Sequence, residues 1–305
     1  MSIINENNTG LSQDNLVAEG QLLGAADIRR IAAEEGITPT KKFGQNFVID
    51  PGTVRKIVNV ANINAENTVM EVGPGLGSLT LAILQTGANL TAVEIDPMLA
   101  KRIPRTVEEF MSKAASRFNV VLHDALTVQP EDVPKLKNAE SFTLVANLPY
   151  NVATPIVLTL LEKFDNLTNF LVMVQKEVAD RLCAEPGSKV YGTPSVKLAW
   201  YGRAQRAGLI GRNVFWPAPN VDSALVSFTR GQYAKDNVEE RNVEERKEVF
   251  ELVDAAFKQR RKTLHSALKN IVPDEAYDAA GIDPTRRGET LTCDEFVKLA
   301  RAVRQ

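Results

Sequence analysis

Four consecutive residues have the side chains and the spacing to hold a flat base that carries an amine. Asn147, Leu148, Pro149 and Tyr150 follow an apolar run at 142–146 that is typical of a buried parallel strand. The side-chain oxygen of Asn147 and the carbonyl of Leu148 can each accept a hydrogen bond from an exocyclic NH2 group. Pro149 fixes the backbone that aims this carbonyl, and the Tyr150 ring can stack on a heterocycle. Taken alone, the same residues also fit a strand-to-helix turn with an asparagine N-cap.

A glycine-rich turn at 71–77 joins a predicted strand to a predicted helix. Glycine lets the backbone approach a ligand closely, and the N-terminus of the helix offers free N–H groups. The dinucleotide fingerprint requires its third glycine three residues after the second, whereas Gly77 comes two residues after Gly75. With a proline between Gly73 and Gly75 and with Glu71 before the turn, the segment fits S-adenosylmethionine better than NAD.

Two acidic residues stand where the next two strands are expected to end. Glu94, in the predicted strand 90–95, is placed to accept hydrogen bonds from both hydroxyls of a ribose, and its charge would repel the 2′-phosphate of NADP. Asp96 fits the N-cap of the following helix instead, because a proline comes next. Asp124, just past the strand at 120–123, can accept a hydrogen bond from the amine of an adenine, and a turn-capping role fits it as well.

Strands and helices alternate in the segment that must position these residues. The expected strands are 68–72, 90–95, 120–123, 142–146 and 170–174, followed by 207–210 and 225–229. The expected helices include 53–61 before the first strand, and 78–86 and 155–163 between strands. This rhythm predicts an α/β, Rossmann-like fold with a mostly parallel sheet and right-handed crossovers. Since the candidate residues follow different strands of this sheet, its carboxyl edge would bring them together in one site.

The predicted organisation has four parts. Residues 1–23 have the composition of a flexible tail, 24–232 form the Rossmann-like domain, 233–246 a charged linker and 247–305 a small all-helical domain. The linker contains a tandem five-residue repeat, Asn-Val-Glu-Glu-Arg, which is too short to build a core. Helical spacing predicts the helices of the last domain at 249–257, 262–269, 274–280 and 293–303.

The composition excludes several classes of protein. With 44% apolar and 24% charged residues, the chain of 305 is typical of a soluble globular protein. No stretch approaches the ~18–20 apolar residues of a membrane span, and the N-terminus carries no export signal. Cys183 and Cys293 stand far apart and there are only two histidines, which argues against a zinc cluster and a disulfide scaffold. We therefore expect a cytoplasmic protein without a metal and without a membrane partner.

The net charge of −2 says little about partners, because the charge is unevenly distributed. Residues 236–251 hold seven acids and three bases, whereas 255–270 hold five bases and no acid. A basic run of the second kind can hold a nucleic-acid backbone, and it can also be a solvated face of a helix.

Several segments together resemble the ribosomal RNA adenine N6,N6-dimethyltransferases, in particular the bacterial small-subunit (16S) enzymes. The resemblance covers roughly residues 38–305. It rests on the motifs GQNF at 44–47, EVGPGLG at 71–77, EID at 94–96, DAL at 124–126, NLPYN at 147–151, QKEVADR at 175–181, SKVYG at 188–192, VFWPAPNVDS at 214–223 and FKQRRKTL at 257–264. The chain departs from the family pattern in its longer N-terminal tail and in Val48, where leucine is more usual.

The resemblance implies an activity, a cofactor, a partner and a set of site residues. The activity is S-adenosylmethionine-dependent dimethylation of the N6 amine of two adjacent adenosines in the 3′-terminal hairpin of 16S rRNA, with a role in late small-subunit biogenesis. The implied partner is 16S rRNA within the small ribosomal subunit, and the protein is expected to be monomeric. The residues expected to contact the cofactor are Asn46, Val48, Gly73, Gly75, Glu94, Asp124 and Asn147. The expected catalytic residues are Asn147, Leu148, Pro149, Tyr150 and Phe215, with Tyr150 and Phe215 clamping the flipped adenine. The residues expected to hold the RNA backbone are Lys41, Lys42, Lys258, Arg260, Arg261 and Lys262.

Three other functions compete with this interpretation. A DNA adenine methyltransferase uses a similar turn, but Leu148 stands where a proline is usual and no target-recognition domain is evident. A large-subunit rRNA methyltransferase is closer, although the Tyr191-Gly192 region and the basic residues at 259–262 favour the small-subunit type. A ribosome-assembly factor that only binds RNA would not need a complete set of cofactor-binding residues.

Overall fold

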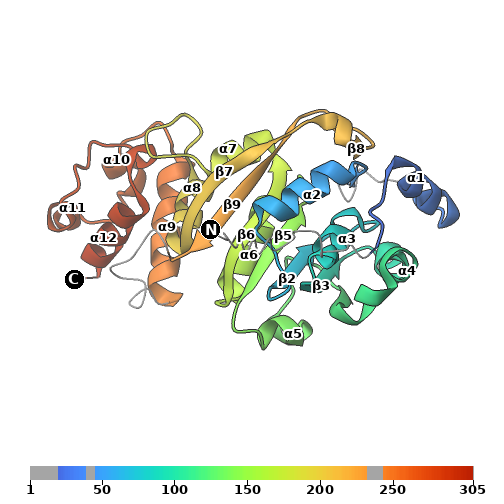
Figure 1. Ribbon diagram of the computed structural model, residues 1–305. Coiled ribbons are helices and arrows are strands. Elements are labelled where there is room, and N and C mark those ends of the chain that lie inside the picture. Colours follow the sequence, from blue (N-terminus) through green and yellow to red (C-terminus); the bar gives the residue numbers. More distant parts are fainter. Residues whose placement is uncertain (1–19, 39–44, 232–242, 305) are drawn as a thin grey trace, which may run out of the picture.

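The computed structural model describes residues 20–38, 45–231 and 243–304. Within these ranges seven strands form one sheet in the order β4-β3-β2-β5-β6-β9-β7 (Figure 1). The strands are β2 (Thr68–Val72), β3 (Asn89–Glu94), β4 (Phe118–Leu122), β5 (Phe142–Asn147), β6 (Leu167–Gln175), β7 (Gly202–Ile210) and β9 (Ser223–Arg230). The strands β2 to β6 pair in parallel, and β9 runs antiparallel to both β6 and β7. This is the predicted Rossmann-like sheet with an antiparallel end.

Helices cover both faces of the parallel part, so its strands are apolar on both sides. One face carries Val69 and Val145 and packs against α1 (Ala25–Glu34), α2 (Pro51–Val60), α3 (Ser78–Gln85) and α4 (Pro97–Met111). The other face carries Met70 and Leu144 and packs against α6 (Ala153–Lys163) and the later helices. Neighbouring residues of one strand thus enter opposite clusters, as the alternation of strand side chains requires.

Between β6 and β7 the chain forms two helices that the apolar pattern did not predict. They are α7 (Lys176–Leu182) and α8 (Thr193–Tyr201), and the following strand β7 begins at Gly202, five residues before the expected 207. The strand β7 lies at the edge of the sheet and exposes Arg203, Gln205 and Arg206, so it lacks the apolar alternation by which strands are predicted.

The C-terminal helices are α9 (Val243–Lys258), α10 (Leu264–Leu268), α11 (Asp274–Ala280) and α12 (Cys293–Val303). They share a continuous apolar cluster with the sheet. Polar contacts add to this packing, because Arg246 lies 2.7 Å from Glu162 of α6 and the Tyr191 hydroxyl donates to the carbonyl of Leu291 at 2.8 Å. The expected linker ends earlier than 246, since α9 begins at Val243, and its remaining residues lie outside the described ranges.

Of the segment 1–23, which is predicted to be a flexible tail, the structure describes residues 20–23. Leu22 and Leu23 are buried, and the N–H of Gln21 donates to the carbonyl of Phe110 at 3.1 Å, so the last residues of the segment 1–23 belong to the folded domain. The two leucines pack in the same cluster as α1 and α4. Among the described residues, none of the helices is both long enough and apolar enough to cross a bilayer.

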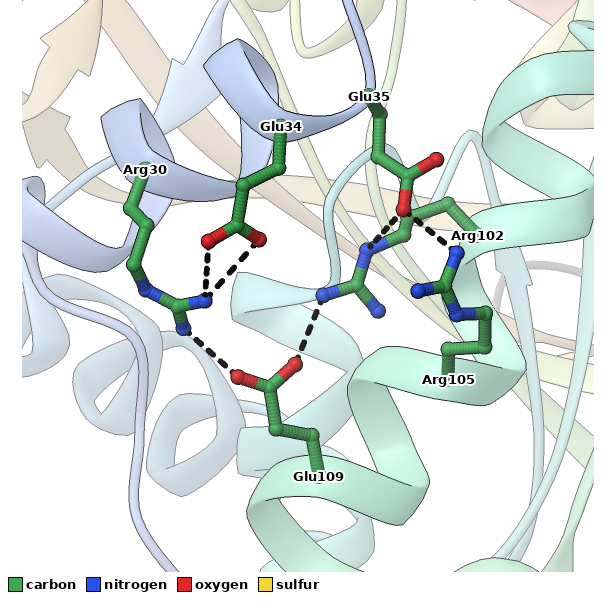
Figure 2. Close-up of polar contacts among 6 residues, drawn as sticks. All are labelled: Arg30, Glu34, Glu35, Arg102, Arg105 and Glu109. Atoms are coloured by element: carbon green, nitrogen blue, oxygen red, sulfur yellow. Dashed lines mark hydrogen bonds and ion pairs between the residues drawn. The ribbon is translucent and has the colours of Figure 1, made fainter.

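An ionic network holds α1 against α4 (Figure 2). The Arg102 side chain is 2% exposed, and its nitrogens lie 3.4 Å from Glu35 and 2.9 Å from Glu109. Arg30 of α1 reaches Glu109 at 2.7 Å, and Arg105 of α4 reaches Glu35 at 2.7 Å. The pairs Arg30–Glu109, Arg102–Glu35 and Arg105–Glu35 cross from one helix to the other and so hold the two helices together.

Candidate active site

A cavity of about 280 Å³ opens at the carboxyl ends of β2, β3 and β5. Its lining includes ten of the predicted site residues, namely Asn46, Val48, Gly73, Gly75, Glu94, Asp124, Asn147, Leu148, Pro149 and Tyr150. The fold therefore brings together residues that lie up to about a hundred positions apart in the chain. Phe215 does not line the cavity, but it pairs with Val48, which does line it.

The glycine-rich turn has the backbone that a close approach to a ligand requires. Gly73 and Gly75 adopt φ of +69° and +58°, which L side chains rarely do. A Cβ at Gly73 would meet no protein atom within 4 Å and would instead occupy space beside the cavity. A Cβ at Gly75 would lie 3.0 Å from the Phe47 ring. The turn thus leaves room for a ligand and fits the group that the sequence predicts.

Glu94 lies at the end of β3 with 4% of its surface exposed. One carboxylate oxygen accepts from the N–H of Gly75 at 3.3 Å and the other from the N–H of Asp96 at 3.0 Å. These bonds hold the carboxylate in the cavity wall, and burial raises its pKa above the usual range. A carboxylate fixed by backbone donors has further lone pairs with which to accept from ribose hydroxyls.

Two other predicted acids act as caps. The Asp96 side chain accepts from the N–H of Met98 at 2.9 Å at the start of α4, as its sequence context predicts. The Asp124 side chain accepts from the N–H of Leu126 at 2.9 Å and also faces the cavity. Its contact with an adenine stays a prediction beside this capping role.

The segment 147–150 forms a turn in which the Asn147 amide is held in a defined orientation. Its Nδ2 donates to the carbonyl of Asn46 at 3.1 Å, which leaves the side-chain oxygen for another partner. The N–H of Leu148 donates to the carbonyl of Met173 at 3.1 Å and continues the pairing with β6. The N-cap of α6 is Val152 and not the asparagine, so the interpretation of Asn147 as a helix cap is wrong.

The Tyr150 ring is fixed at its far end. Its hydroxyl lies 2.8 Å from the hydroxyl of Ser223, the first residue of β9, and burial raises the pKa of the phenol. Phe215 belongs to the short strand β8 (Phe215–Trp216), which pairs with β1 (Phe47–Val48). The two expected clamp residues are thus held by different strands.

Sequence reasoning missed the roles of two buried polar residues at the site. Glu71 is 1% exposed, lines the cavity and accepts from the Thr80 hydroxyl at 2.6 Å. Burial raises its pKa to about 8, with a smaller contribution from the charge of Glu94. Ser223 is fully buried and contacts Tyr150. An acid within an apolar strand was the signal for Glu71, whereas nothing in the sequence distinguished Ser223.

The basic residues that were expected to hold RNA differ in their surroundings. Lys258, Arg260, Arg261 and Lys262 are exposed at the end of α9 and just beyond it. Arg260 is engaged within the protein, because it lies 2.8 Å from Glu289 and donates to the carbonyl of Lys189 at 2.6 Å. The remaining two predicted RNA contacts, Lys41 and Lys42, lie outside the described residues.

Comparisons with known proteins show the family of the chain. The family model described as Ribosomal RNA adenine dimethylase matches residues 38–305. The ribosomal RNA small subunit methyltransferase A of Bifidobacterium adolescentis is 72% identical over 289 residues, which are 93% of this chain and 95% of the relative. The protein of the same name from Paenarthrobacter aurescens is 51% identical over 290 residues, again 93% and 95%.

A solved structure shares the fold. The crystal structure of a dimethyladenosine transferase from Plasmodium falciparum has a TM-score of 0.66 at 22% identity and covers 82% of this chain and 94% of its own. At this identity the likeness shows the Rossmann-like methyltransferase fold alone. The match of the family model and the identity to the curated relatives go further, and they show that the chain belongs to the ribosomal RNA adenine dimethylase family.

Proposed function

We propose that the protein transfers methyl groups from S-adenosylmethionine to the N6 amine of two adjacent adenosines in the 3′-terminal hairpin of 16S rRNA. We further propose that it does so within the small ribosomal subunit, late in its biogenesis, as a cytoplasmic monomer. The main support is the Asn147 amide, which the Asn46 carbonyl orients beside a cavity that also contains Glu94 and the glycine-rich turn. The relatives named as small-subunit methyltransferases favour 16S rRNA over the large-subunit RNA.

The residues of the chain would position the substrate and would not attack it. When bound, S-adenosylmethionine supplies a methyl group that its sulfonium already activates. The adenine N6 amine is a weak nucleophile, because its lone pair is delocalised into the ring. The Asn147 side-chain oxygen and the Leu148 carbonyl would accept from the two amine hydrogens, which turns the lone pair out of the ring and toward the methyl group.

Other residues in and beside the cavity would hold the two ligands in register. Glu94 would accept from the ribose of the cofactor, and Asp124 from its adenine amine. Tyr150 and Phe215 would clamp the adenine of the RNA by stacking, and Tyr150 is already fixed by Ser223. Two rounds of transfer require a pocket that also admits an amine with one methyl group.

The test is to incubate the purified protein with unmethylated small subunits and labelled cofactor, and then to map the modified nucleotides. We expect two adjacent dimethylated adenosines near the 3′ end of 16S rRNA. Label in large-subunit RNA or in DNA would instead support one of the alternatives. A pure RNA-binding factor would give no label, and its melting temperature would not change with S-adenosylmethionine.

The Asn147→Ala variant tests the mechanism. Loss of one preorganised polar group should lower kcat by ~10²–10³. Asn138→Ala, at an exposed position far from the cavity, is the matched control and should keep the wild-type rate. A near-normal single-turnover rate for Asn147→Ala would contradict the role assigned to this side chain.

A further inference from the structure

The antiparallel end of the sheet has one face that carries polar side chains where the rest of the sheet is apolar. The register places Thr143, Asn169, Thr229 and Arg203 in one row across β5, β6, β9 and β7. Residues that face each other across paired strands point to the same side of a sheet. In the next row, Gln205 pairs with a serine of β9. Arg203 and Gln205 are exposed, and the others are partly exposed.

The opposite face of the same strands is covered. There Phe170 of β6 stacks on Phe228 of β9 with ring centroids 4.7 Å apart. Next to it, Arg230 donates to the carbonyls of Leu161 and Phe164 at the end of α6. Around Phe170 and Arg230, the polar face is therefore the one that is open to a partner.

The stretch of chain that contains β7 carries charge of one sign, and its Arg203 lies on the polar face. Between Glu185 and Asp222 the chain has five bases, at Lys189, Lys197, Arg203, Arg206 and Arg212, and no acid. Ordinary solvated faces mix charges of both signs. Three of these bases have acidic partners, because Arg206 pairs with Asp180 at 2.7 Å, Lys197 with Asp254 at 2.9 Å and Arg212 with Asp222 at 3.9 Å.

The helix α2 extends the basic face toward the active site. It has no acid between Pro51 and Val60 and exposes Arg55 and Lys56. A Cβ built at Gly208 of β7 would lie 3.8 Å from Lys56 Nζ, so this ammonium group stands over the strand. Among the residues that the structure describes, neither Lys56 nor Arg203 has an acidic partner within 4 Å.

The face also runs between the two parts that a large RNA would have to touch. At one end, β7 follows α8, which packs against α9 of the C-terminal helices. At the other end, β9 begins at Ser223, which contacts Tyr150 of the active site. The strands β7 and β9 span this distance in Figure 1. The six steps from Ser223 to Thr229 correspond to about 20 Å at 3.3 Å per residue.

We propose that this face, defined by Lys56, Asn169, Arg203, Gln205 and Thr229, binds the sugar-phosphate backbone of the substrate RNA. The inference rests on the proposed function. Lys56 and Arg203 would contact phosphates, and the amide and hydroxyl groups would bond to phosphate oxygens and 2′-hydroxyls. Such contacts carry no sequence information, so the face would position the RNA while the pocket selects the base.

The test measures affinity for the unmethylated small subunit as a function of salt concentration. Each phosphate contact that is lost flattens the plot of log K against log salt by roughly 0.7–0.9, so the double variant Lys56→Ala/Arg203→Ala should lose about 1.4–1.8. The cofactor-induced melting shift and kcat at saturating subunit should stay at wild-type values. The matched control is Arg206→Ala, which removes a cation of the same strand that points to the other face and pairs with Asp180.

A slope equal to that of the wild type would overturn the proposal, and so would an equal flattening by Arg206→Ala, since net charge alone would then explain the effect. Weaker binding without a change in slope would indicate a protein partner on the subunit and would also overturn it. Should the alanine pair unfold, Lys56→Gln/Arg203→Gln gives the same readout.

If the wild type methylates no 16S adenosine, the proposed function itself fails. If the wild type is active and the slope stays unchanged, only this inference fails.

Discussion

Replacing Glu71 by glutamine should remove a pH dependence from the stability of the protein. The Glu71 carboxyl is buried in β2 and accepts a hydrogen bond from the hydroxyl of Thr80 at 2.6 Å. Burial raises the pKa of Glu71 from 4.5 to about 8. In the unfolded chain the same group ionises at its ordinary pKa. Between these two values the folded state holds a proton that the unfolded state has lost.

This difference fixes the sign and the size of the effect. Because the folded state binds the extra proton, the free energy of unfolding falls as the pH rises from 4.5 to about 8. At 1.36 kcal/mol per pH unit, the loss over this interval is about 5 kcal/mol. The full contribution is present below pH 4.5 and is gone once the pH has passed about 8. Glutamine is neutral at every pH and can still accept a hydrogen bond from Thr80. The unfolding free energy of Glu71→Gln should therefore not show this loss as the pH rises.

The assay is urea unfolding of the wild type and of Glu71→Gln at pH 5, 6.5 and 8. The stability of the variant relative to the wild type should rise by about 1.4 kcal/mol per pH unit across this range. Glu66→Gln, at an exposed position just before β2, is the matched control and should follow the wild type. A difference between wild type and Glu71→Gln that stays constant with pH would refute the reasoning that burial keeps this carboxyl protonated.

Three further predictions concern the α1–α4 interface, the Tyr150 hydroxyl and the glycine-rich turn. Arg102→Ala should lower the unfolding free energy by about 1.5–3 kcal/mol, the value of hydrogen bonds to charged groups, because it removes a buried arginine while Glu35 and Glu109 keep Arg105 and Arg30 as partners. Arg105→Ala removes an arginine that is 66% exposed and should lower the unfolding free energy by under about 1 kcal/mol. Similar losses for Arg102→Ala and Arg105→Ala in urea unfolding would contradict this account of the network. Tyr150→Phe and Ser223→Ala should each lower kcat/KM by about 2- to 12-fold, which is the value of one hydrogen bond. The double variant should lose no more activity than either single variant. Additive losses would show that the two hydroxyls act separately. Gly77→Ala should lower the unfolding free energy by about 1–3 kcal/mol, since the φ of Gly77 is +106° and the new Cβ would lie 2.7 Å from a side chain of α4. An unchanged thermal midpoint would contradict this prediction and would mean that α4 shifts away from the new methyl group without loss of stability.

The sequence by itself determined the succession of parallel strands along the chain and the place of the candidate site. The apolar runs that become β2, β3 and β5 are buried on both faces, so they are long enough and apolar enough to be recognised. Glu94 and Asn147 were found because they end such runs, and strand ends meet at one edge of a parallel sheet.

The tertiary structure alone decided how these side chains are held. The orientation of the Asn147 amide depends on the carbonyl of Asn46, which lies 101 residues earlier in the chain. The contact of Tyr150 with Ser223 spans 73 residues, and the protonation of Glu71 follows from burial. The polar face beside Arg203 exists only through the pairing of β6, β9 and β7. Local patterns cannot specify such features, because each depends on groups that become neighbours only when the chain is packed.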